Sequence, residues 1–156
     1  MYWQAMRVGP WLDHGALRAA FAEAFSLDPA RIYVIDYPDL WQGPIPPEPR
    51  IMLECARHEG HSPLQLDAFL VGDEVERPVA DLAGTLDRAQ ALAKRLCATL
   101  LFGTGPIEHC EEIRVAPNGA IDIVQLDWDD DDEHKLVILG SRPLTELPTE
   151  PVPASA

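Results

Sequence analysis

The sequence has few basic residues, few cysteines and no long hydrophobic run. Its 12 lysines and arginines are outnumbered by 26 aspartates and glutamates, which leaves a formal net charge of −14. Nucleic acids and anionic membrane surfaces are bound mainly through Lys and Arg, so this charge argues against both as direct ligands. No apolar run approaches the roughly 20 residues that span a bilayer, and the first residues do not resemble a secretory signal.

Cysteine is scarce as well, with three residues, Cys55, Cys97 and Cys110. An odd number at wide spacing is unlike the dense disulfide framework of a small secreted domain. We therefore expect a protein of the reducing cytoplasm. The basic residues are ten Arg and only two Lys, a bias that indicates a GC-rich bacterial coding sequence.

The chain is long enough for one hydrophobic core. It has 156 residues, 47% of them hydrophobic, and a single domain usually spans roughly 100 to 200 residues. Four of the last fourteen residues are proline. We therefore predict one globular domain over residues 1–142 and a Pro-rich tail over residues 143–156 that is extended or disordered.

Two amphipathic segments predict helices. Asp13 is a favourable N-cap, and apolar residues at helical spacing follow it as far as Asp28, which precedes a proline; we predict a helix over residues 14–26. A second apolar face recurs over residues 82–98, with charged residues opposite, and predicts the second helix. The segment between Gly72 and Pro78 is polar and is expected to be a break.

Several segments predict strands. Residues 32–35 are continuously apolar and are expected to form a buried central strand. Residues 51–55 and 64–70 alternate between apolar and polar, which is typical of half-buried strands, and Gly60 lies in the short connection expected to pair them. Five prolines over residues 38–49 favour an extended surface loop. Residues 99–102 could be a last helical turn or a strand.

The clearest local signal is Ala116-Pro117-Asn118-Gly119, because Pro suits the start of a turn and Gly its positive φ. Strands on either side of it, together with residues 134–139, predict a three-stranded meander. The predicted fold class is therefore α+β, with a mostly antiparallel sheet and two amphipathic helices packed on one face.

Five consecutive carboxylates, residues 129–133, form the expected tip of this meander. Asp127, Asp129 and Asp131 have the spacing of the first three ligands of a calcium loop. The rest of that pattern fails, because Asp132 stands where glycine makes the sharp turn and Ile138 where a bidentate glutamate is needed. The tip is then either a solvated turn or a contact for a basic partner, which would relieve its self-repulsion.

Two tryptophans stand close to carboxylates. Trp128 precedes the acidic run and Trp41 lies in the proline loop, and an aromatic ring beside carboxylates is an effective contact unit. An alternative for Trp128 is a place in the core, on the face of Val124 and Leu126. The expected partner-binding residues are Asp127, Trp128, Asp129, Asp130, Asp131, Asp132, Glu133 and Trp41.

A zinc site is a further alternative. Cys55, His58 and His61 are spaced three residues apart, and His109 and Cys110 could complete a tetrahedral set. Cys55, however, alternates inward as an ordinary apolar strand residue would, and the spacing identifies no group that would orient a Cys-His nucleophile. Common phosphate-binding, hydrolase and metalloprotease motifs are missing. We expect no catalytic residues, no bound metal and no cofactor.

These observations favour a cytoplasmic binding protein over an enzyme. A small, strongly acidic domain without motifs has the physical character of a bacterial immunity protein, which occludes the active site of a toxin with a basic surface. The expected partner is a basic protein, with no nucleic acid and no membrane involved. Two alternatives stay open, a dimeric chaperone or adaptor for a secreted effector and a small metal-dependent enzyme.

Overall fold

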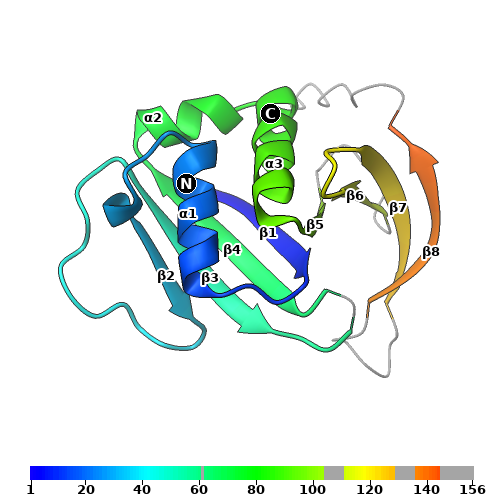
Figure 1. Cartoon of the computed structure of the whole chain (residues 1–156), viewed down its shortest axis with the longest axis horizontal. Coiled ribbons are helices and arrows are strands. Elements are labelled where there is room, and N and C mark those ends of the chain that lie inside the picture. The colour runs from blue at the N-terminus through cyan, green and yellow to red at the C-terminus, as the bar shows by residue number, and fades with distance from the viewer. Residues whose placement is uncertain (61, 104–110, 129–135, 145–156) are drawn as a thin grey trace, which may run out of the picture.

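The computed structural model describes residues 1–60, 62–103, 111–128 and 136–144, and this part of the chain is a mixed α/β structure that is mostly sheet (Figure 1). Eight strands form one sheet, accompanied by three α-helices. The strands are β1 (Tyr2–Gly9), β2 (Ile32–Asp36), β3 (Arg50–Arg57), β4 (Leu64–Val71), β5 (Thr99–Phe102), β6 (Glu111–Val115), β7 (Ile121–Trp128) and β8 (Leu136–Pro143), and the helices are α1 (His14–Ala24), α2 (Asp73–Glu76) and α3 (Leu82–Leu96).

The sheet has the order β2-β3-β4-β1-β5-β6-β7-β8, so the N-terminal strand lies inside it, between β4 and β5. Sequence periodicity did not predict β1. A register shift between Tyr2 and Gln4 places both Trp3 and Met6 in the core, although they are an odd number of residues apart. A bulge of this kind interrupts the alternation by which a half-buried strand is recognised.

The prediction that residues 32–35 form a central strand was wrong in position. They belong to β2, which is the edge of the sheet and pairs only with β3, in parallel. Ile32, Tyr33 and Val34 are nevertheless buried, because α1 packs against the strand and Trp41 lies on Tyr33. A continuous apolar run indicates cover on both faces of a strand, which an edge strand can also have.

The predicted meander is present. Ala116 and Ala120 are joined by a backbone hydrogen bond of 2.9 Å, and Gly119 has a φ of 86°, as the turn requires. The ambiguous segment before it is a strand, β5, which pairs with both β1 and β6. The edge strand β8 reaches Pro143 in its pairing with β7. Residues 145–156, most of the expected tail, and residues 129–135, the acidic run, lie outside the described residues.

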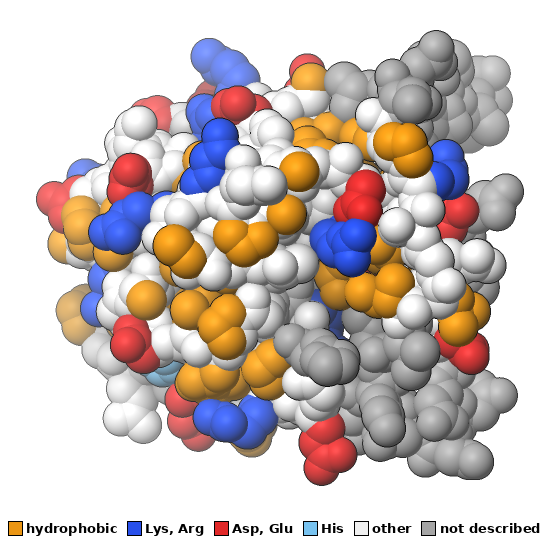
Figure 2. All heavy atoms as spheres, turned by 45° about the vertical axis from the view of Figure 1, so that its right-hand side comes forward, with side chains coloured by type: hydrophobic (Ala, Val, Ile, Leu, Met, Phe, Trp, Pro, Cys, Tyr) orange, Lys and Arg blue, Asp and Glu red, His pale blue; other side chains and the backbone are white. Residues whose placement is uncertain are grey.

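Charges of both signs are interspersed on the surface that Figure 2 shows, with hydrophobic side chains exposed between them. Several arginines contact a carboxylate, among them Arg95 with Glu23, Arg88 with Asp87 and Arg142 with Glu111. The positive charge of these arginines is therefore partly neutralised by neighbouring carboxylates.

Both predicted helices are present and slightly shorter than expected. Asp13 caps α1 by accepting a hydrogen bond of 2.7 Å from the Ala16 amide, and Asp81 caps α3 in the same way at the Gly84 amide. The expected polar break contains a third helix, α2, followed by a 3₁₀ turn, Arg77–Val79. Val75 and Val79, four residues apart, are buried there, so even this acidic segment has an apolar side.

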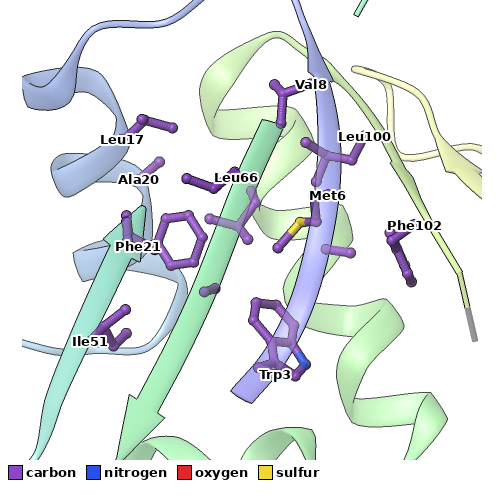
Figure 3. Close-up of a cluster of buried hydrophobic side chains, with 14 of the residues drawn as sticks. Trp3, Met6, Val8, Leu17, Ala20, Phe21, Ile51, Leu66, Leu100 and Phe102 are labelled. Atoms are coloured by element: carbon purple, nitrogen blue, oxygen red, sulfur yellow. The ribbon is translucent and has the colours of Figure 1, made fainter. Parts of the chain in front are cut away.

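Helices α1 and α3 lie side by side over the sheet, and the core is enclosed between them and the strands (Figures 1 and 3). Leu17, Ala20 and Phe21 project from α1 toward the sheet, where Leu66 and Met6 lie (Figure 3). No helix among the described residues is long and apolar enough to cross a membrane.

Candidate functional site

The proline loop, which we define as residues 37–49, connects the parallel strands β2 and β3 and is fastened at its end. Nη1 of Arg31 donates to the carbonyl oxygens of Pro47 and Glu48 at 3.1 and 2.9 Å. Arg50 donates to the carbonyl oxygen of Pro46 at 3.4 Å. Two guanidinium groups therefore hold a segment that has no regular secondary structure, and hydrogen bonds from a charged donor are stronger than neutral ones.

Trp41 fastens the middle of the loop. Its ring lies on Tyr33 of β2, with the ring centroids 4.3 Å apart, and its Nε1 donates to the carbonyl oxygen of Pro44 at 3.4 Å. The side chain is half-buried. Trp41 therefore shapes the loop through contacts within the chain, while its predicted part in partner binding stays a prediction.

Large apolar side chains of the same loop point into solvent. Tyr37, Leu40 and Ile45 are 69%, 83% and 63% exposed. The carboxylates of Asp36 and Asp39 lie beside them and are exposed as well. The loop thus combines a constrained backbone, uncovered apolar groups and negative charge, which together are typical of a contact surface.

The predicted acidic site is described only in part. Asp127 lies on β7 and is exposed, and Trp128 is the last residue of that strand. Asp129, Asp130, Asp131, Asp132 and Glu133 lie outside the described residues. The partner-binding role of these residues therefore stays a prediction.

A neighbouring acidic residue, Asp122, is neutralised. It lies opposite Arg114 in the pairing of β6 and β7, and Nε of Arg114 donates to its Oδ1 at 2.8 Å. This hydrogen bond, with the carboxylate charge, raises the pKa of Arg114. Asp122 therefore adds little to the negative charge available for a partner.

The Arg114–Asp122 pair borders an open cavity of about 460 Å³. Ser62, Leu101 and Ile138 also line it. Its volume falls within the range of small-molecule pockets, but its two charged groups already satisfy each other, and a ligand would have to displace one of them.

Arg7 and Glu112 are a second pair of opposite charges on the sheet. Arg7 is only 8% exposed, and its Nε donates to the carbonyl oxygen of Ser62 at 3.3 Å. Burial lowers the pKa of Arg7 and raises the pKa of Glu112, and each charge partly offsets the shift of the other. Oε2 of Glu112 is buried and has no hydrogen-bond partner in the described part of the chain.

A third group of side chains meets where β2 ends and α1 begins. His14 is the first residue of α1, Asp36 is the last of β2, and Cys55 lies opposite Asp36 in the pairing with β3. Nε2 of His14 is 2.9 Å from Oδ1 of Asp36. One ligand atom from each of the three residues lies within 4.8 Å of the other two.

The surroundings of the Cys55 thiol disfavour its ionised form. Burial, together with the charges of Asp36 and Asp67, raises its pKa to about 12. The thiol is therefore protonated at neutral pH, whereas a reactive cysteine needs a stabilised thiolate.

The side chains that lie beside Cys55 in the structure are not the ones that the spacing in the sequence suggested. His58 lies in the connection to β4, where its amide donates to the Pro63 carbonyl oxygen, while His61, His109 and Cys110 lie outside the described residues. His14 and Asp36 were missed because they are distant from Cys55 in sequence. The only local signal was an aspartate directly after the apolar run of residues 32–35 and a histidine directly after an N-cap.

Known proteins offer no guide to which of these features is functional. No protein-family model, no curated protein and no solved structure matches this chain. Because unrelated functions share folds, the function of this chain is inferred from the chemistry of the described residues.

Proposed function

We propose that this chain is an acidic cytoplasmic binding protein that inhibits a basic protein partner, as a bacterial immunity protein inhibits its toxin. The observation that carries the proposal is the proline loop, where Tyr37, Leu40 and Ile45 are exposed on a backbone held by Arg31. No catalytic role is proposed for this surface.

The fastened loop lowers the free-energy cost of binding. Ordering a flexible side chain or loop on association costs about 0.5–1.5 kcal/mol per immobilised side chain. The bonds from Arg31 and the contact of Trp41 with Tyr33 fix the loop backbone before a partner arrives. More of the energy from burying the apolar side chains then appears as affinity.

The charges near the loop indicate what the partner offers. Exposed apolar anchors are suited to a pocket, and the surrounding carboxylates Asp36, Asp39 and Glu48 are suited to a rim of Lys and Arg. An enzyme acting on a nucleic acid or nucleotide has such a basic active site. Occlusion of that site by the proline loop is the proposed mode of inhibition.

Net charge would act over a longer range. A formal charge of −14 attracts a basic partner and raises the association rate, most strongly at low salt. The acidic run, residues 129–133, is proposed as a second contact with Asp127 and Trp128. Its expected effect is on the association rate, because long-range attraction between charges influences encounter more than dissociation.

The experiment for the loop begins with the product of the adjacent gene. Both proteins are purified, and association and dissociation rates are measured at several salt concentrations for the wild type and for Leu40→Ser. Loss of an apolar anchor should speed dissociation by more than about tenfold. Leu139→Ser is the matched control, since Leu139 is 59% exposed on β8, and should leave dissociation unchanged. Equal effects of the two substitutions, or no complex, would count against the proposal.

The acidic run is tested separately by replacing Asp129, Asp130, Asp131 and Asp132 with asparagine. The expected result is slower association with a flatter salt dependence and nearly unchanged dissociation. Unchanged association kinetics would remove the role proposed for this segment.

Oligomeric state separates the inhibitor from the alternative of a dimeric adaptor. Sedimentation of the isolated chain should show a monomer. A stable dimer that dissociates on Leu40→Ser would instead mean that a second copy covers the proline loop.

A further inference from the structure

We propose that His14, Asp36 and Cys55 form a zinc-binding site at the carboxyl ends of the parallel strands β2 and β3. The inference does not depend on the proposed inhibitor function, because it is tested without a partner and shares only Asp36 with the surface proposed for that function. It also revises the choice of ligands, since His14 and Asp36 replace the histidines that spacing suggested.

The donor atoms suit zinc. Imidazole nitrogen, carboxylate oxygen and thiolate sulfur are the three ligand types that zinc takes from proteins, whereas calcium and magnesium prefer oxygen alone. Zinc–ligand bonds of about 2.0–2.3 Å place neighbouring donors around a tetrahedral ion roughly 3.3–3.8 Å apart. Here the three donor atoms lie within 4.8 Å of one another, and His14 and Asp36 are 2.9 Å apart, so small side-chain rotations reach that geometry.

Regular secondary structure positions the three ligands. Asp36 and Cys55 are opposite each other in the β2–β3 pairing, and the Tyr37 amide donates to the Cys55 carbonyl oxygen at 2.8 Å. His14 lies in the first turn of α1, directly after the N-cap Asp13. Sites on helices and strands are held more accurately than sites on loops.

The three proposed ligands differ in their exposure to solvent. The side chains of His14 and Asp36 are 39% and 53% exposed, while Cys55 is buried at 2%. An ion can therefore enter from solvent and meet the sulfur at the base of the site. Three protein ligands leave a fourth position for water, an arrangement typical of catalytic rather than structural zinc sites.

The test uses the full chain, stripped with a chelator under reducing conditions and titrated with Co²⁺ and then Zn²⁺. Cobalt bound to a thiolate gives a strong charge-transfer absorption in the near ultraviolet, which reports the sulfur ligand directly. We expect one ion per chain, with zinc displacing cobalt and abolishing the absorption. Calorimetry gives the zinc affinity of each variant.

Three substitutions should weaken binding, namely Cys55→Ser, His14→Gln and Asp36→Asn. Loss of an outer partner of a metal ligand already costs roughly 10- to 100-fold in affinity, so loss of a ligand should cost at least about 100-fold. Cys97→Ser and His58→Gln are matched controls and should leave binding unchanged. Because His14 and Asp36 are exposed, their variants should fold even if Cys55→Ser does not, and circular dichroism checks this.

Two results would overturn the inference. One is the lack of stoichiometric zinc or cobalt binding to the folded wild type. The other is binding that survives in His14→Gln and Asp36→Asn, or that is lost in a control, since the metal would then use other ligands. Neither result bears on the proline loop, which is tested by partner kinetics alone.

Discussion

The two faces of the sheet differ in the kinds of side chain that they carry and in how deeply these are buried. On the face covered by α1 and α3, Ile51, Leu53 and Leu66 are at most 1% exposed (Figure 3 labels Ile51 and Leu66). The alternate residues Glu54 and Asp67 of the same strands face the other way and are half-buried. The same strands thus contribute to a uniform apolar core on one face and a mixed surface on the other.

Charge on the second face is organised across strands. The pairing registers place Arg7, Leu101, Arg114 and Asp122 in one row over β1, β5, β6 and β7. A buried charged group such as that of Arg7 is tolerated in a protein when it has a partner of opposite charge or a hydrogen bond. The comparison teaches that apolar packing alone fills the covered face, whereas the other face combines paired charges with a smaller apolar cluster of Leu101, Val124 and Leu126.

The largest expected effect tests the covered face. Phe21 is fully buried and contacts Trp3 and Phe25, and Phe21→Ala should lower the free energy of unfolding by about 3–5 kcal/mol through loss of contacts and the cavity left behind. Phe69→Ala is the control on the other face, where Phe69 is half-buried and contacts Tyr2. Urea denaturation measures both, and equal losses would erase the distinction between the faces.

A pair of glycines tests how closely the two helices that cover this face are packed against neighbouring segments. A Cβ at Gly84 would lie 1.9 Å from the Pro78 carbonyl oxygen, so Gly84→Ala should destabilise the protein by about 1–3 kcal/mol as α3 is displaced. At Gly15 the nearest atom is 3.4 Å away, and Gly15→Ala should stabilise α1 by up to about 1 kcal/mol. Thermal unfolding of both variants should give shifts of opposite sign.

A double-mutant cycle on Arg114 and Asp122 tests the charge pairing of the second face. Their side chains are 31% and 27% exposed, so solvent screens the pair in part, and the coupling free energy should be about 1 kcal/mol. Raising the salt concentration should reduce it. A coupling near zero would mean that the pair contributes nothing measurable to stability.

The last prediction concerns how the ionisation of Glu112 makes the stability of the protein depend on pH. Burial raises the pKa of Glu112, so the folded state holds this proton more tightly than the unfolded state. The stability that this bound proton contributes is fully present below the ordinary pKa of glutamate and is lost as the pH rises through the raised pKa of Glu112. Glu112→Gln should therefore stabilise the protein at neutral pH, less so in acid. Urea denaturation across pH checks this, and a gain independent of pH would contradict it.

Local signals in the sequence were sufficient for much of the fold. The cap at Asp13, the turn ending at Gly119 and the alternation in β3 and β4 each depend on residues close together in the chain, and each predicted its element correctly. The sequence failed where local and tertiary requirements differ, as at the bulge of β1. The segment of α2 was missed because only the burial of Val75 and Val79 reveals its apolar side.

The candidate sites divide in the same way. The proline loop and its Trp41 were recognisable from composition, but the exposure of Tyr37 and Leu40 was not, because burial depends on what the rest of the chain covers. His14, Asp36 and Cys55 come together only because β2 is parallel to β3 and α1 begins beside their carboxyl ends.

By itself, the sequence determined the acidic charge, most helix and turn positions and the alternation of the paired strands. These depend on composition and on interactions between near neighbours. Tertiary structure alone decided the strand order, the edge position of β2 and the convergence of His14, Asp36 and Cys55. Those features depend on contacts between residues far apart in the chain, whose pairing is selected by the packing of the whole core.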